Sequence, residues 1–398
     1  MTARLEPKRV KGKASCRPIQ KELNDNPYLT YDRKLFSENI ESFFLILQFA
    51  VGKHIKNTIH INESDWYSIY DIATKQSLVG IMLEGVQIIS ERNNSQKPPL
   101  PLLYEWIGIA EHIKRQSKLM GERCVMLTGI LRSWEYDICI LKGQGVAHLY
   151  PKPELRQSGD IDIWVNGSRK DTVKLLKEHN ISLSYIDYVN CHAGFFTDVE
   201  VEAHFKPTWM YNPFTDRKLQ KWVEANKAAQ MANYDKEVKF SYPAIEFNLV
   251  FSLIHIYRHV FQEGIGLRQL MNYYYILTHS TSEERTNAYA TLCSFGMKKF
   301  VGAVMSVLRI VFDIDEALLL CEPNNKEGKF LLDEILRGGN FGKYDDRNEV
   351  IPVDNKLQHG LFNIKHNLRY LRHYPSEVLW MPLWKTWHWV WRKKKGYL

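Results

Sequence analysis

The sequence predicts an α+β fold in which a small mixed sheet is flanked by helical regions on its N-terminal and C-terminal sides. Three observations lead to this prediction. Apolar residues recur at helical spacing through residues 36–133. Short alternating or continuous apolar runs, separated by turn residues, follow between residues 134 and 212. From about Pro213 onward the helical pattern returns.

These shifts divide the chain into four segments. Residues 1–35 are a basic leader rich in Lys, Arg, Asn and Pro, which we expect to be flexible. Residues 36–133 form the helical N-terminal region, residues 134–212 the sheet-containing core, and residues 213–398 the helical C-terminal region. A chain of 398 residues with 45% hydrophobic and 13% aromatic content can bury substantial cores, which excludes a disordered protein.

Positive charge is concentrated at the two ends of the chain. The first 21 residues carry a net charge of +6 and residues 385–398 carry +5, which leaves −3 for the body between them. Such a body is not a basic nucleic-acid-binding domain, so no stable nucleic-acid complex is expected. The basic tails are expected to make only weak contacts with anionic surfaces.

Cysteine spacing and hydropathy indicate the compartment. The six cysteines are isolated and form no CxxC pair, so they predict neither a zinc ribbon nor a disulfide framework. The basic N-terminus lacks the apolar segment of a signal peptide, and the nearest apolar stretch, Phe43–Val51, is too short to span a bilayer. We therefore expect a cytoplasmic protein that is at most peripheral at a membrane.

The helical N-terminal region is expected to end in one long helix. Residues Asn62–Asp65 supply capping side chains before a first amphipathic segment. A loop with paired prolines, Asn93–Pro101, then precedes a helix predicted over Leu102–Ser133.

A strand followed by a glycine-containing turn opens the core. The apolar run Asp137–Leu141 predicts the strand, the turn is Lys142–Gly145, and a short helix is expected over Val146–Tyr150. Backbone N–H groups at such a turn favour phosphate, and Lys142 adds a positive charge. Because the GxxxxGK[ST] spacing of a P-loop is absent, a plain helix N-cap remains the alternative.

The strand predicted over Asp160–Val165 carries two acids. Asp160 and Asp162 are two residues apart, so they share one face, roughly 6–7 Å apart at Cα, while the isoleucines between and after them pack inward. We expect the acids to face solvent. Two like charges there repel each other, and a hard divalent cation such as Mg²⁺ offsets both. Gly159 leaves room for a phosphate to approach the backbone. The alternative is a strand face with two solvated acids.

Further elements follow on both sides of residue 212. A helix is predicted over Arg169–His179, and strands over Ser182–Val189 and Phe195–Phe205. Residues 338–356 are rich in Gly, Asp and Asn and predict a long loop. Helices are predicted in the C-terminal region over Pro243–His259, Leu267–His279, Ser282–Phe295 and Lys298–Val311.

The segment ILKGQGVAHLYPKPELRQSGDIDIWV, residues 140–165, resembles the uncharacterised bacterial nucleotidyltransferase family of the DNA polymerase β-like superfamily. The later segment VEAHF, residues 201–205, resembles the family's (D/E)LHW strand, and the resemblance extends over about residues 138–280. Two departures stand out. Lys142 and Gly143 replace the superfamily's Gly-Ser, so a hydroxyl contact to phosphate is missing. Ala203 and Phe205 replace a Leu and a Trp. The matching residues are Lys142, Gly143, Tyr150, Pro151, Arg156, Gly159, Asp160 and Asp162.

The resemblance implies a polymerase-β-like core and a two-metal reaction. A nucleoside monophosphate would pass from an NTP to an unidentified acceptor, and pyrophosphate would be released. It implies a third carboxylate on a neighbouring strand, for which Glu202 is favoured over Glu200. The catalytic residues would be Asp160, Asp162 and Glu202, and these would hold two Mg²⁺ ions. The nucleotide-binding residues would be Lys142, Gly143, Arg156, Gly159, His204 and Arg268.

Two other classes of function remain as alternatives. One is a catalytically silent protein of the same fold, associated with surface-polysaccharide assembly. The presence of all three candidate metal ligands favours the enzyme over it. The other is a nucleic-acid-modifying enzyme, which the negative body disfavours. For Arg156, a structural salt bridge is the alternative to a phosphate contact.

Two patterns in the C-terminal region have a structural and a functional interpretation. His255 and His259 have the i, i+4 spacing of metal ligands, but Ile256 stands where a zinc protease has Glu. The family resemblance implies that this helix and its His pair cap the nucleotide cleft, whereas packing histidines are favoured. Four tryptophans recur at helical spacing before the basic tail Lys393–Lys395, namely Trp380, Trp384, Trp387 and Trp391. A helix docked on the body is favoured over one lying on an anionic membrane.

Overall fold

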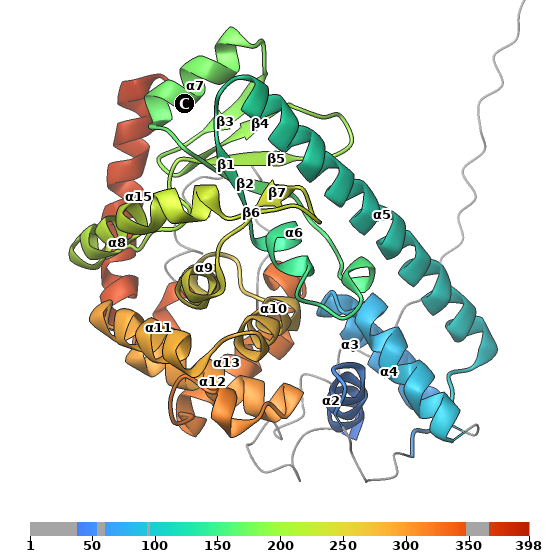
Figure 1. Cartoon of the computed structure of the whole chain (residues 1–398). Coiled ribbons are helices and arrows are strands. Elements are labelled where there is room, and N and C mark those ends of the chain that lie inside the picture. Colours follow the sequence, from blue (N-terminus) through green and yellow to red (C-terminus); the bar gives the residue numbers. More distant parts are fainter. Residues whose placement is uncertain (1–37, 54–59, 94–95, 348–365, 398) are drawn as a thin grey trace, which may run out of the picture.

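The computed structural model describes residues 38–53, 60–93, 96–347 and 366–397 (Figure 1). The expected basic leader, residues 1–35, lies outside them, as do residues 348–356 of the loop expected over residues 338–356. The structure has the predicted α+β organisation, with helices on both sides of a mixed sheet. The helices before the sheet are α2 (Glu38–Ala50), α3 (Glu63–Lys75), α4 (Val79–Arg92) and α5 (Leu100–Ser133).

The sheet has five strands in the order β1-β2-β5-β4-β3. Strands β2 and β5 are parallel, whereas the other neighbouring pairs are antiparallel. Helix α6 (Lys142–Ala147) follows β1 directly, and α7 (Arg169–Glu178) connects β2 to β3. The strands are β1 (Ile138–Leu141), β2 (Ile161–Val165), β3 (Leu183–Ile186), β4 (Asn190–Ala193) and β5 (Val201–His204).

Two predictions in this region need correction. The strand expected over Phe195–Phe205 is only Val201–His204, and a separate strand, β4, lies at Asn190–Ala193 where none was expected. The short helix begins at Lys142 and not at Val146. The first difference arises where tertiary pairing outweighs local pattern, because β4 is a short strand held between β3 and β5.

Both faces of the sheet are covered. Ile161 and Ile163 belong to a core that includes Leu127 and Leu131 of α5, and Figure 1 shows α5 running along that flank. On the other face Trp164 stacks on Phe247, with ring centroids 5.6 Å apart. The expectation that the acids of β2 face open solvent is therefore wrong for Asp162, which is only 4% exposed.

The C-terminal region supplies the cover of that second face. The helices are α8 (Pro213–Ala232), α9 (Ile245–Gln262), α10 (Leu267–Thr278), α11 (Ser282–Ser294), α12 (Lys298–Phe312), α13 (Asn325–Gly338) and α15 (Pro375–Lys395). A short hairpin of β6 (Tyr234–Asp235) and β7 (Phe240–Ser241) joins α8 to α9. Figure 1 shows α9 and α10 below the sheet, with α11, α12 and α13 beyond them and α15 along the flank opposite α5.

Helix α15 docks through its tryptophan stripe, as predicted. Trp384 stacks on Trp209 at 4.0 Å between ring centroids, and Trp387 and Trp391 both contact Tyr188. The buried Glu377 at the start of the helix accepts hydrogen bonds from two backbone N–H groups, those of Tyr211 and Asn212. The tail Lys393–Lys395 is exposed.

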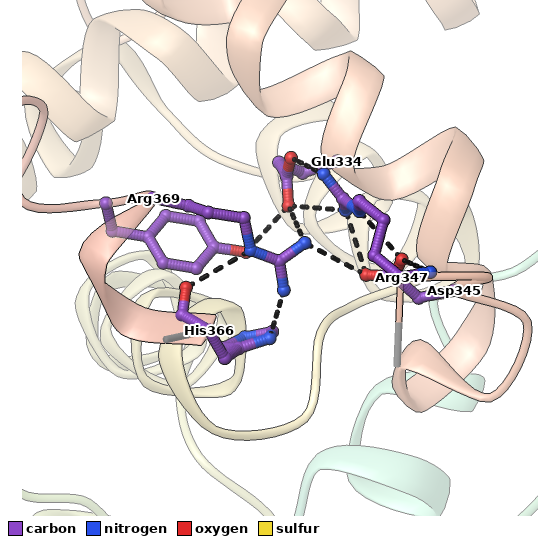
Figure 2. Close-up of polar contacts among 6 residues, drawn as sticks. Glu334, Asp345, Arg347, His366 and Arg369 are labelled. Atoms are coloured by element: carbon purple, nitrogen blue, oxygen red, sulfur yellow. Dashed lines mark hydrogen bonds and ion pairs between the residues drawn. The ribbon is translucent and has the colours of Figure 1, made fainter. Parts of the chain in front are cut away.

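A network of ion pairs holds together parts of the C-terminal region that are far apart in the sequence (Figure 2). The Arg347 guanidinium bonds Glu334 of α13 at 2.8 and 3.0 Å and Asp345 at 2.7 and 2.8 Å. Arg369 donates to Asp345 at 3.1 Å and to the His366 imidazole. The network therefore fixes residues 345–347 and 366–369 against α13.

The described helices and cysteines show two further properties. No helix among the described residues is both long and apolar enough to cross a bilayer. The five cysteines in that part of the chain, at positions 124, 139, 191, 293 and 321, are all free thiols, in line with the prediction that they form no disulfide framework.

Candidate active site

A row of side chains crosses the sheet at one level. Asp162 on β2 is paired in register with Leu141 on β1 and with Glu202 on β5. Glu202 is paired in turn with His192 on β4, and His192 with Tyr185 on β3. Because register partners point to the same face, the row runs from the Lys142 turn to the opposite edge of the sheet.

The centre of this row is a cluster of possible metal ligands. Ligand atoms of Asp162, Glu202 and His204 all lie within 4.8 Å of one another. The His204 Nε2 atom is 2.7 Å from Asp162 Oδ1 and 3.4 Å from Glu202 Oε2. Two residues of β4 hold the Glu202 carboxylate. Asn190 donates to Oε2 at 2.6 Å, and His192 Nε2 lies 3.3 Å from Oε1.

The cluster has a defined charge state. Burial alone would raise the pKa of Asp162, but Lys142 and His204 outweigh it and hold that pKa well below its usual value. The pKa of Glu202 is also lowered, because the hydrogen bond from His204 and the positive charges of His204 and Lys142 together outweigh burial. Although burial opposes it, hydrogen bonds to both carboxylates raise the pKa of His204 to about 9. At neutral pH the cluster thus holds two carboxylates and an imidazolium.

Lys142 occupies a central place in the site. Its ammonium lies 2.8 Å from Asp162 Oδ1, the same oxygen that His204 contacts. Its backbone lies in the left-handed region with φ +45°, and Gly143 follows with φ +24°. A residue other than glycine rarely adopts such a φ, so the backbone at Lys142 is strained. The turn directs the Lys142 side chain toward the acids.

Asp160 lies just before β2 and lines the same cavity, but it is not one of the three clustered ligands. The negative charge of Asp162, together with burial, raises the pKa of Asp160 to about 6. The two carboxylates are therefore electrostatic neighbours, as the Asp-x-Asp spacing predicts. Next to them, no atom lies within 4 Å of the place where a Cβ on Gly159 would stand, so a ligand can approach the backbone there.

Two buried arginines flank the acids, and neither has an ion-pair partner in the part of the chain that the structure describes. Arg156 donates from Nε to Asn272 Oδ1 at 3.0 Å, and its Nη1 atom is buried with no partner. Arg268 donates to the backbone oxygen of Gln157 at 2.9 Å. Arg156 thus makes no loop salt bridge. Burial lowers the pKa of Arg156 and lowers that of Arg268 to about 10, so both remain charged.

All these groups line one cavity of about 510 Å³. All nine residues predicted as catalytic or nucleotide-binding are in its wall, namely Lys142, Gly143, Arg156, Gly159, Asp160, Asp162, Glu202, His204 and Arg268. The rival third acid, Glu200, is exposed and lines a different hollow on the molecule. The structure therefore places Glu202, and not Glu200, beside Asp162.

His255 and His259 also line the cavity, although packing was the favoured interpretation. Their rings meet at 4.2 Å on one side of α9, and burial is the main cause that lowers both pKa values. Helix α9 covers the acid-bearing face of the sheet, which explains why the same apolar helix presents histidines to the cleft. The sequence pattern could not distinguish a cleft wall from a core.

Other residues of the wall were missed. Asn190 and His192 belong to the unexpected strand β4, and an alternation of Asn190, His192 and Gly194 was the only signal for it. Arg258 stands one residue before His259 on α9, and only the histidines of that helix were considered as cleft residues. Lys385 and His388 come from α15, more than 180 residues beyond the acids, and nothing in the sequence indicates that they reach the cleft.

Comparisons with known proteins identify the family of the chain. The model of a family described as uncharacterised nucleotidyltransferase matches residues 62–313, which is more than half of the chain. No curated protein shows significant similarity to the chain. One similar solved structure is that of an antigenic nucleotidyltransferase-like protein from Paracoccidioides brasiliensis, at 13% identity and a TM-score of 0.32, covering 52% of this chain and 94% of that one.

Proposed function

Because the chain belongs to the uncharacterised nucleotidyltransferase family, we propose that it is a magnesium-dependent enzyme that transfers a nucleoside monophosphate from an NTP to an acceptor and releases pyrophosphate. The observation that carries this proposal is the cluster of Asp162, Glu202 and His204 in a cleft that also holds unpaired arginines.

The donor set fits hard divalent cations. Asp162 and Glu202 offer carboxylate oxygens, which Mg²⁺ prefers, and Asp160 offers a third carboxylate in the same cleft. When bound, two magnesium ions would neutralise phosphate charge and stabilise the attacking and leaving oxygens. An imidazole is a poorer ligand for this ion, so we assign His204 to holding the two carboxylates in position and to contact with the nucleotide.

Positive groups at the β1 end of the row fit the triphosphate. Lys142, the Gly143 turn, Arg156 and Arg268 surround Asp160, and guanidinium groups bind phosphate oxygens in a forked geometry. Because neither arginine has a carboxylate partner, an incoming phosphate meets two desolvated charges without breaking an ion pair. This is why we assign the donor nucleotide to this end.

Chemistry then proceeds at the centre of the row. An acceptor hydroxyl oxygen attacks the α-phosphorus, and the bond from that phosphorus to the bridging oxygen of pyrophosphate breaks. Glu202, ionised at neutral pH, accepts the hydroxyl proton. Asn190 and His192 position its carboxylate for this step.

One observation favours the alternative of a catalytically silent protein with the same fold. Asp162 Oδ1 already bonds both Lys142 and His204, so a metal ion has to displace one of them to reach this oxygen. We retain the enzyme, because each carboxylate group has further lone pairs for a cation and Asp160 adds a third carboxylate to the cleft.

Calorimetric titration of the purified protein with each NTP, with and without Mg²⁺, tests the proposal. We expect tight binding of at least one NTP only when Mg²⁺ is present, and weaker binding by Arg156→Met and Glu202→Gln. Equal binding with and without Mg²⁺ would contradict the proposal. Magnesium-dependent binding without pyrophosphate release, in the presence of cell extract as a source of acceptors, would favour the silent alternative.

A further inference from the structure

One end of the cleft is closed by α15, a helix that lies beyond the residues matched by the family model. Trp384, Lys385 and His388 of this helix line the cavity. Trp384 stacks on Trp209 at 4.0 Å with an interplanar angle of 12°, and the Arg258 guanidinium lies 4.0 Å from the centroid of the same Trp209 ring. An aromatic cluster thus joins α15 to α9 at this end.

This end lies at the β3–β4 edge of the sheet, away from the residues assigned to the triphosphate. Arg392 of α15 lies over Tyr185 of β3 at 4.3 Å, and Trp387 meets Tyr188 at 5.0 Å. Tyr185 is the last member of the row that begins next to Lys142. Neighbouring strands are about 4.8 Å apart, so the two ends of a five-strand row are separated by roughly 19 Å.

Three nitrogen-bearing side chains at this end, Lys385, Arg258 and His388, have no ion-pair partner among the described residues. Burial lowers the pKa of the Lys385 ammonium, and no carboxylate of the described residues pairs with it. Among the described residues, Arg258 donates a hydrogen bond to Gln262 at 3.2 Å, and its buried Nε has no partner there. The buried Nε2 of His388 also has none.

Asp187, an acid that faces this end, forms no ion pair with Lys385 or Arg258. Asp187 lines the cavity, but its Oδ1 accepts the backbone N–H groups of Val189 at 2.6 Å and Asn190 at 2.8 Å. That carboxylate is thus held by the turn between β3 and β4. Lys385 and Arg258 are thus partly withdrawn from water without a direct ion-pair partner among the described residues, and an anion that enters the cleft supplies one.

We propose that Lys385, Arg258 and His388 form an anion-binding subsite for the acceptor, so that the acceptor carries a phosphate or carboxylate group in addition to the hydroxyl that is modified. The proposal rests on the proposed nucleotidyl transfer for the identity of the ligand as acceptor. The hydroxyl would lie at Glu202 in the centre of the row and the anionic group against α15. Since α15 lies outside the matched region, it would select the acceptor for this chain.

The test measures anion binding while the donor end is filled. The full-length protein is saturated with Mg²⁺ and a non-hydrolysable NTP analogue, and inorganic phosphate or acetate is then titrated calorimetrically. Lys385→Met is compared with Lys394→Met, which removes the same charge from an exposed position on the same helix. We expect Lys385→Met to weaken phosphate or acetate binding about tenfold, as for one lost charge-assisted hydrogen bond, and Lys394→Met to match wild type.

Each outcome decides one of the two proposals. Equal anion affinity in the two variants, or no anion binding in wild type, overturns the subsite. A larger effect on phosphate than on acetate identifies a phosphorylated acceptor, and the reverse identifies a carboxylate. Failure of the nucleotide analogue to bind instead contradicts the proposed function. In that case the anion affinities of Lys385→Met and Lys394→Met still test the subsite, because the two variants differ only in which lysine is replaced.

Discussion

Several positive groups compete for a single carboxylate oxygen in the site, Oδ1 of Asp162. It is 2.8 Å from the Lys142 ammonium and 2.7 Å from His204, and it is also an oxygen that a cation would use. Lys142 and a metal ion therefore compete for it. When Mg²⁺ and a nucleotide enter together, the lysine can exchange Asp162 for phosphate oxygens, which preserves its charge pairing.

Replacing Lys142 by Met should therefore have opposite effects on two ligands. Binding of Mn²⁺, measured by electron paramagnetic resonance in the absence of nucleotide, should tighten about tenfold, because one nearby positive charge is removed. Binding of NTP with metal should weaken by a similar factor. Lys152→Met, an exposed lysine that lies outside the cleft, is the control and should change neither. Weaker Mn²⁺ binding by Lys142→Met would show that the two cations do not compete.

The raised pKa of His204 predicts how stability depends on pH. The folded-state pKa of about 9 exceeds the unfolded value of 6.5, so protonated His204 stabilises the fold fully below pH 6.5. This contribution, up to roughly 3 kcal/mol, is lost as pH rises through 9. Urea unfolding at pH 6 and pH 9.5 should show the loss in wild type and a smaller one in His204→Gln. An identical pH dependence in both proteins would contradict the assignment.

At the scale of single elements, the sequence predicted those whose pattern is local. The alternation in β2 and the long amphipathic α5 were located within a few residues. Strand β4 was missed because it is short and polar and is held by its neighbours. The burial of Asp162 was missed for a similar reason. Alternation distinguishes the two faces of a strand, but it does not show that α9 will cover the acidic one.

Helix α15 should be part of the folded body. Deleting residues 380–398 removes the Trp384 stack on Trp209 and the contacts of Trp387 and Trp391 with Tyr188, so the melting temperature should fall by several degrees. Thermal melting of the truncated protein measures this effect. An unchanged melting temperature would mean that the helix is not docked in solution.

The exposed tail Lys393–Lys395 should act separately from docking. Polybasic attraction is worth about 1 kcal/mol per residue near an anionic surface, so association with vesicles that contain phosphatidylserine should be weak and abolished by salt. Replacing these three lysines by Gln should abolish vesicle sedimentation and leave the melting temperature unchanged. Firm, salt-resistant sedimentation of the intact chain would contradict a purely electrostatic contact.

At the scale of the whole molecule, the ion-pair network of Figure 2 ties α13 to residues on both sides of the segment 348–365. Arg347 and Arg369, opposed by burial, hold the pKa of Asp345 at about 2. Arg347→Met should leave the buried Asp345 and Glu334 short of positive charge and lower the free energy of unfolding by about 3 kcal/mol. Denaturant titration measures it, with the exposed Arg372→Met as control. A loss no larger than in that control would mean that the network contributes little.

The two ends of the cleft differ in how far the sequence predicts their residues. The family resemblance and the Asp-x-Asp spacing indicated the residues around β1, β2 and β5, because these contacts follow from strand register. The β3–β4 end of the cleft depends on how α9 and α15 dock on the sheet, and no local pattern encodes the approach of Lys385 to residues near 190. The residues assigned to the proposed donor side were therefore predictable, whereas those of the proposed acceptor side required the structure.

The central claim is that Asp162 and Glu202 support nucleotidyl transfer. The most direct measurement incubates the protein with Mg²⁺, cell extract and each of the four NTPs labelled at the α-phosphate, and follows label in products other than the nucleotide. We expect magnesium-dependent transfer by wild type. In Asp162→Asn and Glu202→Gln the transfer rate should fall at least a hundredfold, which corresponds to roughly 3 kcal/mol of activation free energy. Because Asp162 is buried, melting curves must show that each variant is folded. Wild-type transfer by either folded variant would contradict the account.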